Sequence, residues 1–202
     1  MFLKSTPKLV LASTSPYRRA LLERFGLAFT TAAPDVEETR QKDETPLAMA
    51  RRLAHAKAQQ IAAQKTEAWV IGSDQVAVLR GPDSAPEILG KPGTRANCIK
   101  QLQDCSGRMV EFLTAVAVLR HADGAQFEFV DTTRVQFRPL TRETIERYVE
   151  LESPLDCAGG FKSEGLGISL VESIESTDPS ALIGLPLIRL AAILRSAGFQ
   201  LP

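Results

Sequence analysis

Two charged side chains of this sequence stand where a packed protein seldom tolerates charge. Asp74 interrupts the apolar segment AWVIGSDQVAVL, residues 68–79, and a buried carboxylate costs several kcal/mol unless it is paired. Lys57 shares one face of a predicted helix with small apolar residues, so it either snorkels to solvent or points at an internal anion. Because catalytic and metal sites accommodate such groups more readily than a core does, we interpret Asp74 as functional rather than as a structural hydrogen-bond partner.

Further basic groups and carboxylates lie near the ends of predicted strands and helices. Phosphate cleavage needs cations on the phosphate oxygens, a divalent metal ion and an oriented water, and these residue types supply such a site. Mg²⁺ prefers one or two carboxylates together with substrate phosphates, a pattern that Glu38 and Asp74 fit. Seen alone, Glu38 in the polar segment 34–43 is more typical of a solvated acidic loop. The whole set comprises Ser13, Arg18, Arg19, Glu38, Lys57, Asp74, Lys91, Lys162 and Glu164.

The N-terminal part of the chain predicts a strand, a hydroxyl-rich turn and a helix. Residues 9–12 are apolar, Ser15 is a good N-cap, and Pro16 suits the first helical position. The N–H groups at such a helix start favour an anion. Arg18 and Arg19 in the first turn oppose the helix dipole, an unfavourable placement that a bound anion would offset. A capped surface helix with two solvated arginines explains the same residues.

Periodicity and turn residues predict the elements that must position this set. The segment 154–167 is a glycine-rich loop that carries Lys162 and Glu164, and its glycines permit close approach of a ligand, although a flexible surface loop would look the same. Residues 81–87 predict a hairpin connection, after which Lys91 stands at a turn before Pro92. We expect strands over 27–33, 68–79, 108–119, 125–137 and 168–174, and helices over 45–64, 94–104, 141–149, 178–183 and 186–197.

Composition narrows the class of protein. The 202 residues carry 24 Lys and Arg against 24 Asp and Glu, so the balance predicts no bulk nucleic-acid partner. Apolar runs are too short to span a bilayer, and the first residues lack the apolar core of a signal peptide. Three cysteines without a C-x-x-C pair indicate a reducing cytoplasm, and two histidines give little support to a zinc site or a serine triad. No Walker A motif, G-x-G-x-x-G, repeat or linker occurs, and we expect a single domain over residues 1–202.

The segment LASTSPYRRALLERFG, residues 11–26, resembles the opening signature of the Maf family of nucleotide pyrophosphatases. The resemblance extends to about Gly198. It implies an α/β fold in which a long mixed β-sheet with flanking helices forms two lobes around a central cleft, similar to inosine triphosphatase. The other matching features are Glu37-Glu38, Lys57, the Gly-Ser-Asp segment at Asp74, Lys91-Pro92 and the glycine-rich loop that ends in Glu164-Gly165.

The resemblance also implies an activity and roles for the residues. The family cleaves nucleoside triphosphates between the α- and β-phosphates, releasing a monophosphate and pyrophosphate. Asp74 would be the proton acceptor, and Glu38 with Asp74 would hold a divalent metal ion, Mg²⁺ or Mn²⁺. The family further leads us to expect a homodimer. Substrate phosphates would be bound by Ser13, Arg18, Arg19, Lys57 and Lys91.

Three positions indicate a subgroup. The subgroup acting on dTTP and UTP typically has Arg, Thr and Gln where this chain has Tyr17, Gln75 and Glu164. This chain instead resembles the 7-methyl-GTP subgroup, which implies a house-cleaning activity on a methylated nucleotide. An aromatic ring stacks on the cationic base, and a carboxylate accepts hydrogen bonds from the guanine N1 and N2 donors.

Three alternatives stay open. Tyr17 would also be explained by ordinary helix packing. The second alternative is a broader pyrophosphatase that acts on other canonical or modified nucleotides, such as dTTP and UTP. A non-catalytic nucleotide-binding regulator is the third, but the carboxylates Glu38 and Asp74 argue against it, because a pure anion binder gains nothing from buried negative charge.

Overall fold

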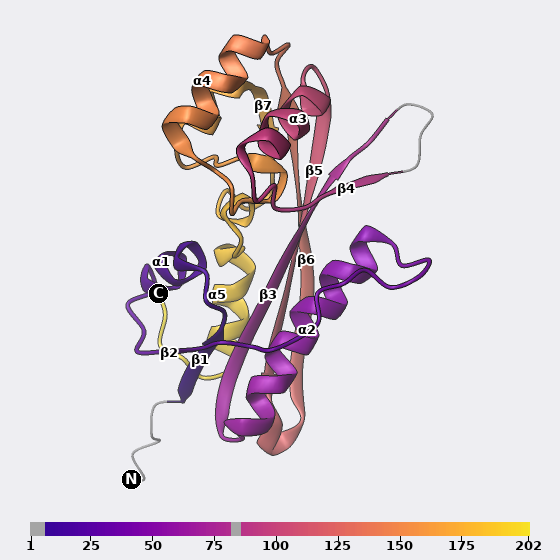
Figure 1. Cartoon of the computed structure of the whole chain (residues 1–202). Coiled ribbons are helices and arrows are strands. Elements are labelled where there is room, and N and C mark those ends of the chain that lie inside the picture. The colour runs from indigo at the N-terminus through magenta and orange to yellow at the C-terminus, as the bar shows by residue number, and fades with distance from the viewer. Residues whose placement is uncertain (1–6, 82–85) are drawn as a thin grey trace. The chain divides into compact units, whose positions relative to one another are not determined.

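The computed structural model describes residues 7–81 and 86–202, which form a mixed β-sheet with flanking helices (Figure 1). In these residues the sheet has seven strands in the order β2-β1-β3-β5-β6-β7, and β4 pairs with β3 outside this path. The strands are β1 (Lys8–Ala12), β2 (Thr30–Ala32), β3 (Ala68–Leu79), β4 (Glu87–Leu89), β5 (Met109–Arg120), β6 (Ala125–Phe137) and β7 (Val171–Glu175). Strand β1 runs parallel to β2 and β3, whereas the β3–β4 and β6–β7 pairs are antiparallel.

The helices agree closely with the predicted ranges. The α-helices are α1 (Pro16–Glu23), α2 (Pro46–Gln64), α3 (Arg95–Cys105), α4 (Arg142–Glu152) and α5 (Leu187–Ser196). The 3-10 helices of the described residues are η1 (His121–Asp123), η2 (Ala158–Gly160), η3 (Leu166–Leu170) and η4 (Ala181–Ile183). The α/β fold class with a long mixed sheet is thereby confirmed.

The chain divides into two compact units. The first comprises residues up to 74, 114–131 and 178–202, and the second comprises 75–113 and 132–177. The long strands β3, β5 and β6 contribute residues to both units.

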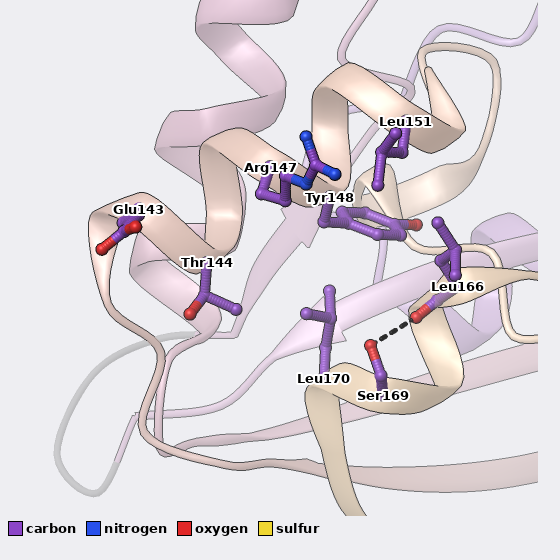
Figure 2. Close-up of a pocket in the computed structure, with 8 residues that line it drawn as sticks. All are labelled: Glu143, Thr144, Arg147, Tyr148, Leu151, Leu166, Ser169 and Leu170. Carbon is purple, nitrogen blue, oxygen red and sulfur yellow. Dashed lines mark hydrogen bonds between the residues drawn. The ribbon is translucent and has the colours of Figure 1, made fainter.

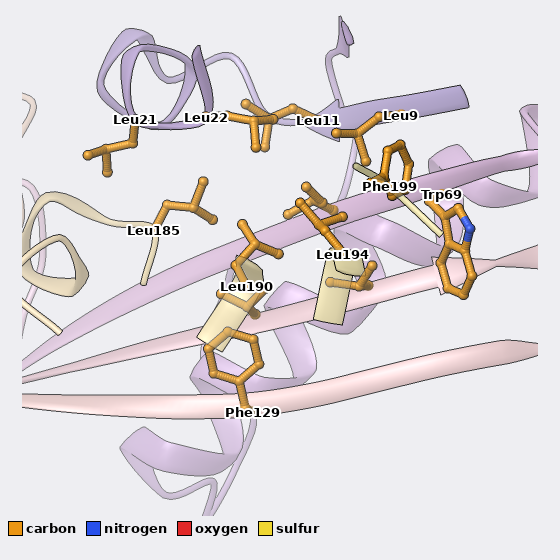
Figure 3. Packing of buried hydrophobic residues seen from close by; sticks show 13 residues of the cluster. Leu9, Leu11, Leu21, Leu22, Trp69, Phe129, Leu185, Leu190, Leu194 and Phe199 are labelled. Carbon is orange, nitrogen blue, oxygen red and sulfur yellow. The ribbon is translucent and has the colours of Figure 1, made fainter. Parts of the chain in front are cut away.

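Alternation along the strands builds the core of the first unit on two faces of the sheet. Leu9 and Leu11 of β1 pack with buried residues of α1 and α5, and Figure 3 shows this cluster from close by. Val10 and Ala12 point to the opposite face, where residues of α2 cover them. Because side chains alternate across a strand, five residues of β1 are enough to join both layers.

Local chemistry explains where the helices of the first unit begin. Ser15 accepts a hydrogen bond from the Arg18 N–H at 3.3 Å, and Pro16 occupies the first turn. Thr45 accepts from the Ala48 N–H at 3.2 Å and is likewise followed by a proline. Both caps are readable from the sequence, and both predicted helix starts are confirmed.

The second unit is organised around aromatic side chains. Phe161, which follows η2, lies 6.0 Å from Phe112 and 5.2 Å from Phe137 between ring centroids. The hydroxyl of Tyr148, on α4, accepts a hydrogen bond from the Lys162 N–H at 3.0 Å. These contacts attach the glycine-rich loop to the core of the second unit.

The prediction of a strand over residues 168–174 is wrong for its first half. Residues 166–170 form η3, and β7 begins at Val171. The cause is a close approach within the loop, since a Cβ on Gly167 would lie 2.4 Å from the Lys162 carbonyl oxygen. The chain therefore folds back on itself here instead of extending.

Two other predicted elements are shorter than expected, and one strand was missed. Strand β2 covers three residues of the predicted range 27–33, and η4 covers three residues of the predicted helix 178–183. The Asp178 side chain accepts from the Ser180 N–H at 2.9 Å, a local turn that delays the helix. Strand β4 was not predicted, and residues 82–85 of the predicted hairpin connection lie outside the described residues.

None of the helices in the described part of the chain has the length and apolar character needed to cross a membrane.

Helix α2 crosses β3 at Gly72 with no room for a side chain. A Cβ at this position would lie 2.3 Å from the Ala54 carbonyl oxygen and 2.6 Å from the Ala58 nitrogen. This contact is with helix backbone, so the helix itself would have to move. The absent side chain at Gly72 therefore sets how closely α2, with Lys57, approaches the strand that carries Asp74.

We predict that Gly72→Ala lowers the free energy of unfolding by about 1–3 kcal/mol, the usual range for overpacking. It should also reduce activity, because α2 carries Lys57. Denaturant unfolding measures the first effect. Gly90→Ala is the matched control, since a Cβ there meets nothing within 4 Å. Equal stability of the two variants would contradict the proposed tight crossing.

Candidate active site

One buried ammonium lies between two carboxylates in the first unit. The Lys57 Nζ donates to Asp74 Oδ1 at 2.7 Å and lies 2.5 Å from Glu38 Oε1. The side chains of Lys57 and Asp74 are 8% and 11% exposed, whereas that of Glu38 is 59% exposed. The lysine is therefore aimed at internal anions and does not snorkel, and the acidic loop reaches the buried carboxylate through it.

The environment of Asp74 raises the pKa of its carboxyl. Burial raises the pKa of this carboxyl above its usual range, although the charges of Lys57 and Arg18 and the hydrogen bond from Lys57 oppose the rise. The charge of Glu38 adds to it. A carboxylate with a raised pKa is a stronger proton acceptor than an ordinary aspartate, which suits a general base.

Arg18 is held by the backbone of a distant segment of the same unit. Its Nε donates to the Gly184 carbonyl at 3.0 Å, and the buried Ser73 hydroxyl donates to the same oxygen at 2.9 Å. Burial lowers the pKa of Arg18, while the charges of Asp74 and Glu38 raise it. Fixing Nε sets the plane of the guanidinium, and arginine contacts phosphate oxygens through donors in that plane.

The loop that presents Gly184 is stabilised by residues that sequence analysis missed. Asp178 accepts from the Ile188 N–H at 2.6 Å and from the Ser180 hydroxyl at 2.5 Å. The Leu187 N–H in turn donates to the Ser180 hydroxyl at 2.8 Å. The Asp-Pro-Ser sequence is a recognisable turn signal, but nothing local indicates that this turn supports an arginine on α1.

Two predicted phosphate-binding residues of the first unit have local roles in the structure. The Ser13 hydroxyl accepts from the Ser15 N–H at 3.1 Å and so shapes the turn before α1. Arg19 pairs with Glu23 one turn along α1 at 3.0 Å, and its side chain is 62% exposed. Arg19 therefore does not contact the Gly184 carbonyl that holds Arg18. A phosphate-binding role for Ser13 and Arg19 stays a prediction.

The remaining predicted residues belong to the second unit, except Tyr17, which lies half-buried on α1. Gln75 follows Asp74 in β3 and is half-buried, and Lys91 is exposed just after β4. Glu164 is exposed, and the Ser163 hydroxyl donates to its carboxylate at 3.3 Å.

The glycine-rich loop is anchored by Glu152, another residue that sequence analysis missed. Its carboxylate accepts from the Leu166 N–H at 2.7 Å and pairs with the Lys162 ammonium at 2.7 Å. Both contacts lower the pKa of Glu152, the hydrogen bond from Lys162 most. A Cβ on Gly165 would lie 2.4 Å from this carboxylate, so the glycine beside Glu164 is required for the anchor.

A separate pocket of about 530 Å³ lies on the second unit (Figure 2). Side chains of α4 and η3 line it, among them Arg147, Tyr148 and Leu166. None of the residues predicted for the active site lines this pocket, so it is not the site inferred from the sequence.

A divalent metal ion fits the first unit only together with a substrate. The described residues include no group of three or more His, Cys, Asp or Glu side chains placed to hold a metal ion. Glu38 and Asp74, which both contact Lys57, offer two carboxylates. This donor set suits Mg²⁺ or Mn²⁺ completed by phosphate oxygens and water, and not a closed protein cage.

These features define the class: an α/β protein with a buried carboxylate of raised pKa beside basic side chains. The family described as Maf-like protein matches residues 8–197, so this chain belongs to the Maf family.

Relatives with curated names cover nearly the whole chain. A 7-methyl-GTP pyrophosphatase of Xanthomonas oryzae pv. oryzae is 54% identical over 196 residues, covering 97% of this chain and 100% of the relative. One of Alcanivorax borkumensis is 49% identical over 197 residues, covering 98% of each chain. Among solved structures, the Ham1 protein of Staphylococcus aureus superposes with a TM-score of 0.48 and 17% identity, over 64% of this chain and 71% of that one.

We predict that Lys57→Met leaves a folded protein with at least about tenfold lower activity, because the stem is retained and the ammonium is lost. Asp74 would then be buried without its cation, so its pKa should rise further. Stability should therefore fall with rising pH more steeply than in the wild type, since the folded state binds the proton more tightly than the unfolded state.

Circular dichroism, thermal unfolding across pH and turnover together measure these effects. Lys65→Met, at the exposed C-terminal end of α2, removes the same charge as a control. Normal activity per folded molecule in Lys57→Met would assign the lysine to structure alone.

Proposed function

We propose that this protein is a nucleoside triphosphate pyrophosphatase that hydrolyses 7-methyl-GTP to 7-methyl-GMP and pyrophosphate. The observation that carries the proposal is the identity of about half of the residues, over nearly the full chain, to relatives that bear the name 7-methyl-GTP pyrophosphatase. The pairing of Asp74 with Lys57 adds physical support, because it supplies a general base in a site with cations. Removal of a methylated nucleotide would be a house-cleaning activity.

In the proposed reaction, Asp74 accepts a proton from the attacking water. The water oxygen forms a bond to the α-phosphorus, and the bond from that phosphorus to the bridging oxygen breaks, so pyrophosphate leaves with the bonding electrons. Arg18, Lys57 and Lys91 would neutralise the phosphate oxygens, with Ser13 and Arg19 as further candidates. A divalent metal ion held by Glu38 and Asp74 would act as a Lewis acid on the phosphates.

Recognition of the base is assigned to Tyr17, Gln75 and Glu164. The 7-methylguanine ring carries a positive charge, so an aromatic ring attracts it through its negative face. The Glu164 carboxylate would accept from the base N1 and N2 donors, and the charge on the base strengthens those hydrogen bonds. Glu164 is exposed and lies beside the anchored Gly165, which supports a role in contacting a ligand.

The setting proposed for this activity is the cytoplasm, with residues 1–202 acting as one functional domain and the chain as a homodimer. Cys98, Cys105 and Cys157 are not joined in disulfides. Burial raises the pKa of Cys98 to about 11 and that of Cys105 to about 12, so these two thiols are unreactive. Three cysteines outside disulfides support a reducing compartment.

A pyrophosphate-release assay over a nucleotide panel, with Mg²⁺ and with Mn²⁺, tests the proposal. The panel should contain 7-methyl-GTP, GTP, dTTP and UTP. A higher kcat/KM for 7-methyl-GTP than for the others is the expected result. Preference for dTTP or UTP would favour the broader pyrophosphatase, and binding without release of pyrophosphate would favour a non-catalytic regulator.

We predict that Asp74→Asn lowers turnover by about a hundredfold or more, the scale of losing a general base. Thermal stability should stay the same or rise, because burial already disfavours the charged carboxylate. In the wild type, activity should fall with decreasing pH at a pKa above that of an ordinary aspartate. Asp43→Asn, at an exposed position, is the control. Near-full turnover in Asp74→Asn would disprove the assignment.

We predict that Glu164→Gln lowers kcat/KM for 7-methyl-GTP. The loss of transition-state stabilisation should be about 1–3 kcal/mol, the range for one charged hydrogen bond. Activity on GTP should change less, because the unmethylated base lacks the positive charge. Tyr17→Leu should act in the same direction with a smaller effect. Both nucleotides are measured on each variant at fixed pH and salt, with exposed Glu172→Gln as control. An equal loss on both nucleotides would mean that Glu164 does not sense the charge of the base.

A further inference from the structure

The acidic loop, residues 34–44, has almost no regular structure but is held at its first end by α2. The Gln60 side chain accepts from the Asp35 N–H at 2.6 Å and donates to the Asp35 carbonyl at 2.7 Å. One amide therefore satisfies both backbone groups of a single loop residue, as a neighbouring strand would. The loop is thus pinned three residues before Glu38.

A second contact from α2 holds the other end of the acidic loop. Arg52 binds the Glu44 carboxylate through both oxygens, at 2.6 Å and 2.9 Å. The same guanidinium donates to the Thr39 carbonyl at 3.2 Å, directly after Glu38. The Gln41 N–H completes the arrangement with a 3.1 Å hydrogen bond to Glu44. The Glu44 side chain is only 7% exposed, although the loop around it is exposed.

The contact between Glu38 and Lys57 is too weak to place the loop without such help. The Glu38 side chain is 59% exposed, and solvent screens ion pairs with exposed partners. Ordering an irregular segment, in contrast, has a large cost in conformational entropy. The bidentate Arg52–Glu44 pair and the Gln60 amide supply contacts of better geometry on both sides of Glu38.

The Glu44 carboxylate of the Arg52–Glu44 pair also stays ionised far below neutral pH. The hydrogen bond from Arg52 lowers the pKa of Glu44 to about 2. The pair therefore contributes its stabilisation above the ordinary pKa of a glutamate and loses it only as the pH falls toward about 2.

We propose that Arg52 and Gln60 are positioning residues, which fix the acidic loop from α2 so that Glu38 stands beside Lys57 and Asp74. The role of Glu38 toward a metal ion rests on the proposed function, whereas the pinning of the loop does not. One helix then presents Lys57 directly and Glu38 through the loop, so the two groups keep their register whenever the helix moves.

Limited proteolysis tests the pinning without any assay of activity. Arg40 and Lys42 are exposed trypsin sites inside the loop. In Arg52→Gln, cleavage after them should be about tenfold faster, because local opening exposes a loop to proteases. Arg51→Gln removes the same charge at the next, exposed position of α2 and should cleave like the wild type. Glu44→Gln should resemble Arg52→Gln. Wild-type cleavage rates in both Arg52→Gln and Glu44→Gln would overturn the proposal.

A double-mutant cycle tests whether Arg52 affects activity through the position of Glu38. Arg52→Gln alone should lower kcat/KM several-fold and raise the Mg²⁺ concentration needed for half-maximal activity. In a Glu38→Gln background it should add little, since the group that it positions is already lost. Full additivity would overturn the positioning role even if the loop is pinned. Full activity of Glu38→Gln would instead refute the metal role in the proposed function. The contacts of Arg52 and Gln60 with the loop would then have no catalytic consequence, although the proteolysis result would stand.

Discussion

The ion pair between Lys57 and Asp74 is the interaction around which the candidate site of the first unit is arranged. A carboxylate inside a buried strand is tolerated when it pairs with a cation, and here the cation comes from a helix that packs very close to that strand. Gly72 permits the close packing, and the small residues Ala54 and Ala58 of α2 accept it. The same helix also holds the acidic loop through Gln60 and Arg52. The positions of Lys57, of its partner Asp74 and of Glu38 therefore all depend on how α2 packs.

Charge balance in the first unit indicates why a nucleotide would need additional cations. Lys57 and Arg18 carry positive charge, and Glu38 and Asp74 carry negative charge, so the four groups nearly cancel. A triphosphate brings several further negative charges into that neighbourhood. Screening by solvent is weak for buried groups, so the phosphates would require counter-charge from a divalent ion or from other basic side chains.

Much of the fold and part of the site could be predicted because the signals are local. Proline after Ser15 and Thr45 marks two helix starts, and Asp74 stands out against its apolar neighbours. Glu152, Asp178 and the Arg52–Glu44 pair could not be found in this way, because their partners lie elsewhere in the chain or on another element. The mistaken strand before β7 has a different cause, a close approach within one loop between Gly167 and the Lys162 carbonyl, which hydrophobic periodicity does not reveal.

The opposing influences on Asp74 suit a base better than either would alone. Burial without Lys57 would favour the protonated form of the carboxyl, which cannot accept a proton. Lys57 without burial would make the carboxylate too weak a base. Together they raise the pKa of Asp74, with the charge and hydrogen bond of Lys57 opposing the effect of burial. Because Lys57 is also assigned to the phosphate chain, a bound nucleotide would compete with Asp74 for the ammonium. The carboxylate would then become more basic at the stage of the reaction in which the water must lose its proton.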